Sequence, residues 1–149
     1  MPTLRDVLVL DDAATGVQTG TIGEPSVAVS GSSYFVTGNW YASRSTDRGH
    51  TWTFVDPFAE FPRDRGSFCC DQVVHRAGRW WLWLLQYRAV HGANVLRLEA
   101  SSTGAPGSWH WWDLSPTDLD PSWAGLWFDF PDVAVTERHV VVSANLYAA

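Results

Sequence analysis

The chain has no lysine and contains two cysteines and one methionine, and these shortages exclude several kinds of protein. All ten basic residues are arginine, and sixteen acidic residues outnumber them, so the net charge is −6. A surface that binds nucleic acid or another polyanion carries clustered Lys and Arg, which this balance argues against. Two cysteines and five scattered histidines show no metal-ligand spacing, so the sequence predicts neither a metal site nor a cofactor.

Long hydrophobic runs are missing as well. No apolar stretch approaches the roughly 20 residues of a membrane span, and residues 1–12 hold a short apolar run without the organisation of a signal peptide. No segment has the periodicity of an amphipathic helix. Short runs rich in Val, Trp, Tyr and Phe alternate instead with clusters of Gly, Pro, Ser and Asp. This pattern predicts an all-β chain of short strands and turns.

One octet, residues 45–52, has the form Ser-x-Asp-x-Gly-x-Thr-Trp. Asp47 can accept hydrogen bonds from the backbone N–H groups that follow it, as Asp often does in turns. Gly49 allows a positive φ without steric cost, and the hydroxyls of Ser45 and Thr51 can bond locally. Trp52 begins the next strand and can bury a large apolar surface. The octet therefore predicts a hairpin turn between two strands.

This octet resembles the Asp box, the repeat of the sialidase-like β-propellers. The resemblance implies four-stranded antiparallel blades, with the box as the turn between a third and a fourth strand. It also implies a structural role for Ser45, Asp47, Gly49, Thr51 and Trp52, since Asp boxes lie away from the ligand face. An extracytoplasmic or secreted location is a further implication of the family.

Imperfect copies of one unit follow each other along the chain. The spacing from Ser26 to Asn39 equals the spacing from Asp132 to Asn145, and the segments around both pairs align without a gap. A looser middle copy ends in residues 102–109, which resemble a box that has lost its Asp. Each copy predicts an inner strand, a turn and a second strand. Four-stranded units in series are typical of a β-propeller.

We therefore predict one partial propeller of about two and a half blades. The first blade covers about residues 22–57, the second about 67–115, and a partial third about 127–149. Propellers typically close with about 4–8 blades, so we expect a fragment of a ring of about six or seven blades. The alternative is a small unit that closes by self-association. The expected partners are therefore the remaining blades or further copies.

The resemblance places ligands where inner strands begin and where second strands connect to third strands. Glu24, Asp71, Asp129 and Asp132 lie at the starts of inner strands and are the candidate catalytic acids. Sugar hydroxyls need polar partners and apolar sugar faces need aromatic rings, so a glycan or polysaccharide is the expected ligand. The candidate ligand-binding residues at the same end are Asn39, Trp40, Gln86, Tyr87, Arg88, Trp127, Asn145 and Tyr147.

Two of these candidates have a second interpretation. Asn39 and Asn145 occupy matching positions, so both could bond a neighbouring backbone as a shared structural role. For the site as a whole, we expect the acids to converge with Gln86, Tyr87 and Trp127 around one concave face, because strand starts and second-strand ends share one end of an up-and-down blade.

Cys69 and Cys70 are adjacent, which is unusual. Neighbouring Cα atoms are ~3.8 Å apart, below the usual disulfide separation of ~4.4–6.8 Å. A vicinal disulfide and two free buried thiols therefore stay open as alternatives. The segments 69–72 and 127–132 also resemble parts of uncharacterised bacterial propeller proteins, a likeness that brings no known activity.

Three functions fit these features. The first is an Asp-box propeller of uncharacterised activity that binds a glycan or another polymer on its inner-strand face, without catalysis in this chain. The second is an exo-acting glycoside hydrolase of the sialidase superfamily. Sialidases carry an Arg-Ile-Pro motif and an Arg triad, whereas the nearest Arg cluster here, residues 61–65, has the wrong order. The third is a purely structural repeat domain.

Overall fold

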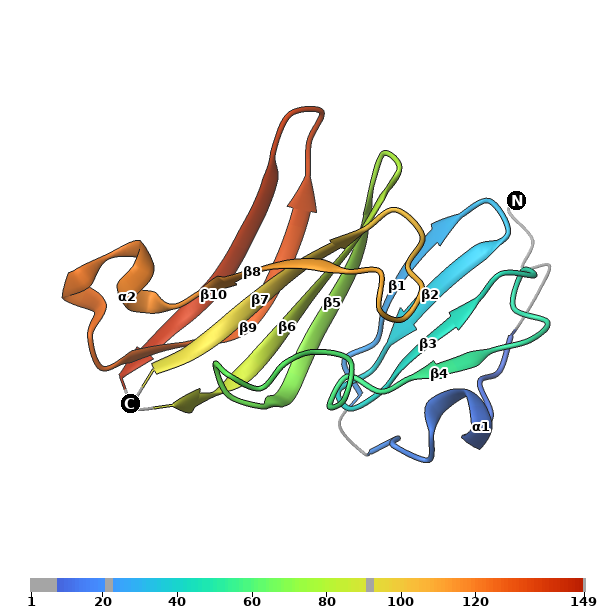
Figure 1. Ribbon diagram of the computed structural model, residues 1–149, viewed down its shortest axis with the longest axis horizontal. Helices are drawn as coiled ribbons and strands as arrows, with labels where there is room; N and C mark the ends of the chain where they lie inside the picture. Colours follow the sequence, from blue (N-terminus) through green and yellow to red (C-terminus); the bar gives the residue numbers. More distant parts are fainter. Residues whose placement is uncertain (1–7, 21–22, 91–92, 149) are drawn as a thin grey trace, which may run out of the picture.

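The computed structural model describes residues 8–20, 23–90 and 93–148, which form antiparallel β-sheets that are not closed (Figure 1). The prediction of an all-β chain is thus confirmed. Sheet 1 has the strand order β1-β2-β3-β4, sheet 2 has β5-β6-β7-β8, and sheet 3 pairs β9 with β10. The strands are β1 (Ser26–Ser30), β2 (Ser33–Thr37), β3 (Ala42–Ser45), β4 (Thr53–Val55), β5 (Phe68–Ala77), β6 (Trp80–Val90), β7 (Ala93–Ser101), β8 (His110–Leu114), β9 (Leu126–Val135) and β10 (Val140–Ala148).

Helical structure in the described residues is short. The α-helices are α1 (Asp12–Thr15) and α2 (Pro116–Leu119), and the 3₁₀ helix η1 (Pro121–Trp123) follows α2. Asp11 caps α1, and Ser115 begins α2 with a capping box. Both α2 and η1 lie in the connection between sheets 2 and 3, outside the repeated unit.

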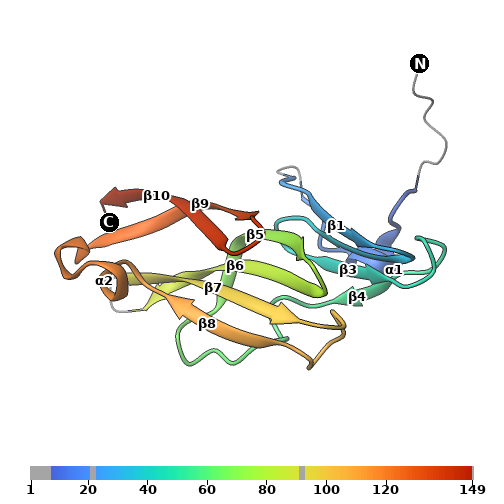
Figure 2. The same cartoon turned by 90° about the horizontal axis from the view of Figure 1, so that it is seen from above.

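Sheet 2 lies between sheets 1 and 3, because both of its faces are apolar (Figure 2). Along β6 the side chains alternate in direction. Trp81, Trp83 and Leu85 belong to the core shared with sheet 1, whereas Leu82 and Leu84 belong to the core shared with sheet 3. A strand that is buried on both faces has a continuous run of apolar residues instead of an alternating pattern. This explains why residues 80–85 of β6 are all apolar.

The core between sheets 1 and 2 is aromatic. Phe35 contacts Trp83 and Trp109 at ring-centroid distances of 5.2 and 5.7 Å, and Phe61 contacts Trp83 at 5.5 Å. These edge-to-face pairs have a geometry that aromatic side chains prefer. Phe128 and Val133 of β9 fill the smaller core between sheets 2 and 3. Packing of large side chains therefore holds the sheets together.

The innermost strands of the sheets are neighbours: β1 lies beside β5, and β5 lies beside β9. The Ser26 hydroxyl joins β1 to β5, since it donates to the Val74 carbonyl (3.2 Å) and accepts from the Val74 N–H (3.1 Å). The buried Gln72 side chain makes a second tie. It donates to the carbonyls of Gly38 (2.6 Å) and Tyr41 (2.9 Å) in sheet 1. The inner strands are thus held in a fixed row.

The octet forms the turn between β3 and β4. The Asp47 carboxylate accepts from the Thr51 N–H (2.9 Å) and hydroxyl (2.6 Å), and the Ser45 hydroxyl donates to it (2.8 Å). The Ser45 oxygen also accepts from the Gly49 N–H (2.8 Å). Gly49 has a φ of 83°, and Trp52 packs on Tyr34. Hydrogen bonds from Thr51 and Ser45 lower the Asp47 pKa to about 2.

A second turn of this kind joins β7 to β8, and it uses hydroxyls in place of the carboxylate. Ser101 accepts from the backbone N–H groups of Thr103 (3.1 Å) and Gly104 (2.9 Å), as Ser45 does in the first turn. The Ser108 hydroxyl lies 2.6 Å from the Ser101 hydroxyl and 2.9 Å from that of Thr103. Trp109 follows this turn, as Trp52 follows the first one, and is buried in the aromatic core.

The first turn lies at the end of sheet 1 that is opposite to the start of β1. Antiparallel pairing puts the β1–β2 turn and the β3–β4 turn at the same end. The Arg48 N–H in the octet donates to the Ser32 carbonyl in the β1–β2 turn (2.8 Å). The start of β1 and the connection from β2 to β3 therefore share the other end.

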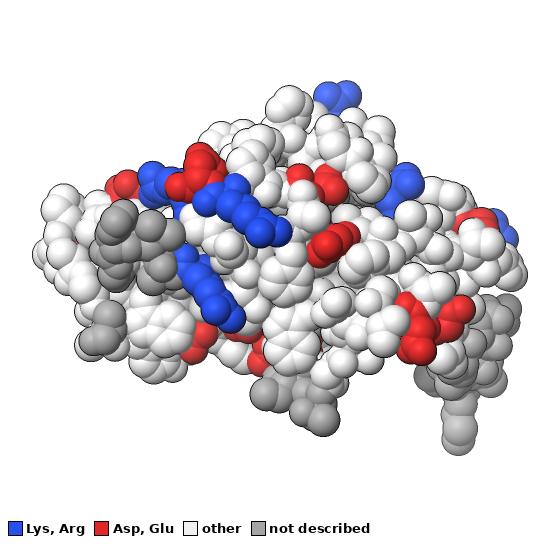
Figure 3. All heavy atoms as spheres, turned by 60° about the horizontal axis from the view of Figure 1, so that its bottom comes forward, with Lys and Arg blue, Asp and Glu red and all other residues white. Residues whose placement is uncertain are grey.

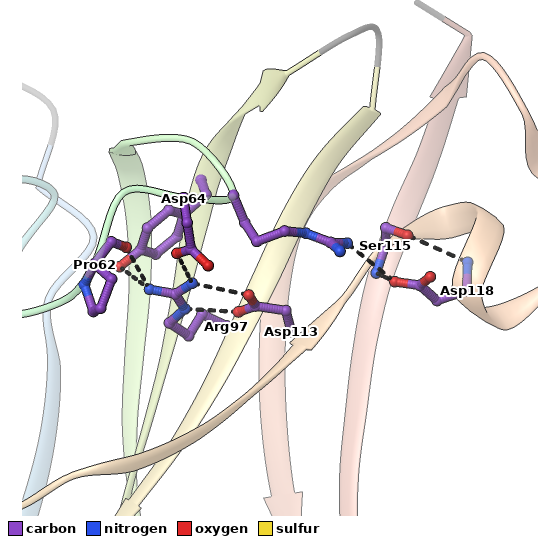
Figure 4. A network of polar contacts seen from close by, with 8 residues as sticks. Pro62, Asp64, Arg97, Asp113, Ser115 and Asp118 are labelled. Carbon is purple, nitrogen blue, oxygen red and sulfur yellow. Dashed lines mark hydrogen bonds and ion pairs between the residues drawn. The ribbon is translucent and has the colours of Figure 1, made fainter.

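The loop of residues 56–67, between sheets 1 and 2, is fixed by Arg97 of β7 (Figure 4). This fully buried guanidinium donates to both carboxylate oxygens of Asp113 (2.6 and 2.8 Å) and to the Pro62 carbonyl (2.8 Å). Asp64 approaches it to 3.7 Å. Burial of a charge is tolerated only when it is paired and hydrogen-bonded, and here the pairing also positions the segment that leads into β5.

An apolar groove of about 520 Å³ lies on sheet 2 beside β10. Sheet 3 has two strands in the described chain, so it covers only part of this face of sheet 2. Trp112 is 57% exposed in the groove. The groove is lined by Ala77, Trp80, Leu82, Leu98, Ala100, His110, Trp112 and Val140.

The hydrogen bonds of Asp47 lead to a prediction for stability. Asp47→Ala leaves the Thr51 N–H without its acceptor and should lower the melting temperature by several degrees at neutral pH. Because the Asp47 pKa is lower in the folded chain, this contribution is present above the ordinary value of 3.8 and is lost as pH falls toward about 2. Thermal unfolding of both proteins across this range measures the difference.

Thr46→Ala is the matched control, because Thr46 is an exposed residue of the same turn. It should leave the melting temperature nearly unchanged at every pH. An Asp47→Ala protein as stable as the unsubstituted one at neutral pH would contradict the role assigned to the carboxylate.

Candidate functional site

A pocket of about 350 Å³ opens where β1, β5 and β9 lie side by side. Three carboxyl side chains line it: Glu24 precedes β1, Asp71 lies near the start of β5, and Asp132 belongs to β9. The other lining residues are Pro25, Ser26, Gln72, Val73, Phe130 and Pro131. The pocket therefore combines carboxyl groups with apolar and aromatic surface.

Irregular backbone forms part of this pocket. The pairing of β5 with β6 shifts register between Phe68 and Gln72, and the pairing of β9 with β10 shifts opposite residues 143–145. Phe130, within the second irregularity, has a φ of 52° and is 64% exposed. Such bulges re-aim side chains next to functional sites, and a non-glycine residue at positive φ is a feature that clusters there.

Asp71 is the central acid of the pocket. Burial, followed by the charge of Glu24 and a hydrogen bond to the Glu24 side chain, raises the Asp71 pKa to about 6. Asp129 adds repulsion from the other side, and the Phe130 N–H partly opposes the rise by hydrogen-bonding to Asp71. Two carboxyl groups this close cannot both ionise easily, so Asp71 keeps its proton up to about pH 6.

Two carboxamides hold the neighbouring acids. Asn39, at the β2–β3 connection, accepts from the Glu24 N–H (3.0 Å) and donates to the Glu24 carboxylate (3.3 Å). Gln86 of β6 donates to the Phe128 carbonyl (3.2 Å) and to the Asp129 carboxylate (3.4 Å). Asn39 is 7% and Gln86 is 2% exposed. Both side chains therefore spend their hydrogen bonds on the acids and on backbone groups, and neither presents its carboxamide to a ligand in the pocket.

The structure places three other sequence candidates around the start of β5. Trp40 is half-buried, and its indole N–H donates to the Cys69 carbonyl (3.2 Å). Tyr87 is 1% exposed and lies under the Arg97 guanidinium, whose central carbon is 4.6 Å from the ring centroid. Arg88 is exposed, and its backbone N–H donates to the Ser67 carbonyl. None of these three residues lines the described pocket.

The last candidates belong to sheet 3. Trp127 and Tyr147 are paired across β9 and β10, with ring centroids 5.8 Å apart. Asn145 is exposed and lies opposite Asp129. The candidates that were expected to converge therefore fall into three groups. Glu24, Asp71 and Asp132 line the pocket, and Asp129 and Gln86 lie next to it. Tyr87 and Trp127 do not line it.

Cys69 and Cys70 form a disulfide with each other within the irregular start of β5. Both side chains are half-buried, and Asp71 follows directly. The bonded pair thus occupies the segment that turns Asp71 toward Glu24. Both sulfurs are bonded to each other, so in this oxidised state neither residue has a thiol that could act as a nucleophile or a metal ligand.

Sequence reasoning did not single out Phe130 or Asn94. Phe130 precedes Pro131, and a residue before proline favours extended backbone, so no pattern in the sequence signals its φ of 52°. Asn94 is buried and bonds the Phe128 backbone on both sides, donating to its carbonyl (2.7 Å) and accepting from its N–H (2.8 Å). Asn94 fixes β9 beside β7, and no sequence pattern marks that contact.

The described residues contain no group of three or more His, Cys, Asp or Glu side chains arranged to hold a metal ion. Within the same residues, the helices are too short and too polar for one to traverse a bilayer. Figure 3 brings forward the end at which the inner strands begin and shows acidic and basic side chains in small separate groups. The part of this end that the picture shows therefore carries no broad surface of one charge sign.

The chemistry available is that of a carboxylic acid beside a carboxylate. A protonated Asp71 donates one hydrogen bond, Glu24 accepts, and the exposed Asp132 accepts as well. Phe130 supplies an aromatic face at the rim. Comparison of the chain with known family models, with curated proteins and with solved structures gave no significant match.

The raised Asp71 pKa leads to a prediction for stability. Below the ordinary value of 3.8 Asp71 is protonated whether the chain is folded or not, whereas above about 6 the folded chain must carry its buried charge. Asp71→Asn removes this cost and should raise the melting temperature by several degrees at about pH 8. The gain should disappear as pH falls toward 3.8. Asp132→Asn, in the same pocket but exposed, is the control and should change little.

The disulfide gives a prediction for mass measurement. Alkylation of the unreduced, denatured chain should add no alkyl group, and alkylation after reduction should add one at each of Cys69 and Cys70. A covalent dimer linked between chains would contradict pairing within the segment.

Proposed function

We propose that this chain is part of an Asp-box β-propeller and that its inner-strand face binds a saccharide. Two four-stranded antiparallel sheets follow one another with their first strands adjacent, as successive blades would. The hydrogen-bonded octet lies at the end away from the pocket, which agrees with the placement of Asp boxes in that family. The remaining blades, or further copies of the chain, would cover the groove beside β10 in a secreted or extracytoplasmic ring.

One observation carries the proposal for the ligand face. Glu24, Asp71 and Asp132 start from three successive inner strands and line one pocket. Convergence of polar groups from several strands in one concavity is what a binding site requires. Sugar hydroxyls both donate and accept, so they can donate to the acceptor oxygens that remain on the hydrogen-bonded pair of Asp71 and Glu24. Phe130 and Pro131 offer apolar surface to the C–H face of a sugar ring.

The charge of the pocket favours a neutral saccharide. Among the described residues, its lining includes Glu24, Asp71 and Asp132 but no Arg, Lys or His. A sialic acid or a uronic acid would bring its carboxylate close to these side chains, and like charges at short range repel strongly where water is partly excluded. Sialidase activity is disfavoured by the same composition, because the described lining offers no cation to hold a substrate carboxylate.

A second candidate function is hydrolysis of a neutral glycoside. The Asp71 pKa of about 6 is in the range of a general acid. A retaining glycosidase needs its two carboxyl groups about 5–5.5 Å apart, whereas Asp71 and Glu24 are in hydrogen-bond contact. The pair therefore fits binding better than double displacement, and binding is the function that we propose.

Binding can be tested with an array of neutral, amino and sialylated oligosaccharides, followed by calorimetry on the best ligand. Neutral oligosaccharides should bind at about pH 5 and several-fold more weakly at about pH 8, because ionisation of Asp71 breaks its hydrogen bond to Glu24 and leaves two carboxylates that repel each other in the pocket. Asp71→Ala should abolish binding. No fluorogenic sialoside should be hydrolysed above the buffer rate.

Asp47→Ala is the control for binding, because the octet lies at the opposite end of sheet 1. Its affinity should equal that of the unsubstituted chain at a temperature where both are folded. Preference for sialylated ligands would overturn the charge argument. Failure of every oligosaccharide to bind would leave a structural repeat domain as the remaining interpretation.

A further inference from the structure

Phe130, which lines the pocket, combines two features that are unfavourable for a folded chain. Its backbone has a φ of 52°, which is costly for a residue with a Cβ atom, and the following Pro131 favours extended backbone instead. Its side chain is 64% exposed, so the ring gains little from burial in the free protein. A strained and exposed aromatic residue in a concave pocket points to a contact that a ligand completes.

The bend of β9 that carries Phe130 is held by groups of sheet 2. Asn94 of β7 donates to the Phe128 carbonyl (2.7 Å) and accepts from the Phe128 N–H (2.8 Å). Gln86 of β6 donates to the same carbonyl (3.2 Å), and the Phe130 N–H donates to the Asp71 carboxyl group. None of these bonds involves the Phe130 ring. The ring is therefore held at the pocket without a ligand, and it can be removed without breaking the bonds that form the bend.

The pocket offers two kinds of surface to a ligand. Phe130 is the one aromatic residue among the described lining residues, and Val73 and two prolines add apolar surface. The carboxyl groups of Glu24, Asp71 and Asp132 supply acceptor oxygens. A ligand that uses both surfaces must present an apolar face and must donate hydrogen bonds from groups outside that face.

A pyranose with equatorial hydroxyl groups has this form. Its axial C–H bonds point away from the two faces of the ring, whereas its equatorial hydroxyl groups extend around the edge. In a furanose or an open-chain polyol, hydroxyl groups lie on the faces as well, so contact with Phe130 would bury a hydroxyl group without a partner. Glucopyranose units belong to the first class and fructofuranose units to the second.

We propose that Phe130 is a specificity-determining residue: its ring stacks on the C–H face of a pyranose and selects pyranose units with equatorial hydroxyl groups over furanoses and polyols. This inference rests on the proposed saccharide site and names the class of sugar that the site takes.

The test is calorimetry at about pH 5 with neutral gluco-oligosaccharides and fructo-oligosaccharides of equal length. The unsubstituted chain should bind the glucose series at least about tenfold more tightly, because that series buries no unpaired hydroxyl group on the ring. In Phe130→Gly the affinity for the glucose series should fall about tenfold, and the preference over the fructose series should disappear. Glycine adopts a positive φ without strain, so the melting temperature should not fall.

Val17→Gly is the matched control. Val17 is also an apolar residue at positive φ (60°) and is 72% exposed, but it does not line the pocket. This variant should bind both series as the unsubstituted chain does. Phe130→Asn gives the same test as Phe130→Gly if the glycine variant does not fold, because Asn also tolerates this backbone. Phe130→Trp keeps an aromatic face and should keep the preference.

The outcomes separate this inference from the proposed function. Equal binding of the glucose series by Phe130→Gly and by the unsubstituted chain would disprove the role of Phe130 and leave the saccharide site standing. Equal affinity of the unsubstituted chain for both series would do the same. Failure of every oligosaccharide to bind the unsubstituted chain would disprove the proposed function, and this inference with it.

Discussion

The whole structure depends on the burial of both faces of sheet 2. The apolar run of β6 sends Trp81, Trp83 and Leu85 toward sheet 1 and Leu82 and Leu84 toward sheet 3. Tryptophan and phenylalanine side chains bury about 150–250 Å² each, so the aromatic layer supplies most of the apolar contact between sheets 1 and 2. Because side chains in a strand alternate strictly, a slip of one residue in β6 would reverse both faces together.

That stacking also creates the pocket. Once sheets 1, 2 and 3 are packed in sequence, β1, β5 and β9 become neighbours and their starts meet at one end. Glu24 and Asp71 are then brought together by topology, although their charges oppose the contact. Sequences tend to retain such unfavourable contacts where function requires them. The bulges at residues 69–71 and at Phe130 adjust the direction of the side chains on this row.

Local patterns were sufficient to predict the strands and the first turn. Short apolar runs between clusters of Gly, Pro and Ser marked β1 and β2, and the octet specified its own hydrogen bonds through Asp47 and Ser45. The spacing of the repeats also indicated that Asp71 and Asp132 would share one end. The partner of each polar side chain could not be predicted, because Asn39 has a donor and an acceptor that suit a sugar as well as they suit Glu24.

Burial was the other quantity that the sequence left open. Tyr87 has the character of a ligand-binding residue, but its position under Arg97 depends on the loop of residues 56–67, whose path no repeat predicts. The disulfide at the start of β5 has a different consequence. A bond between adjacent residues closes only a small local ring, so it removes less conformational entropy from the unfolded state than a bond across a long loop would. It also joins no sheet to another, so cohesion of the three sheets comes from packing and hydrogen bonds instead.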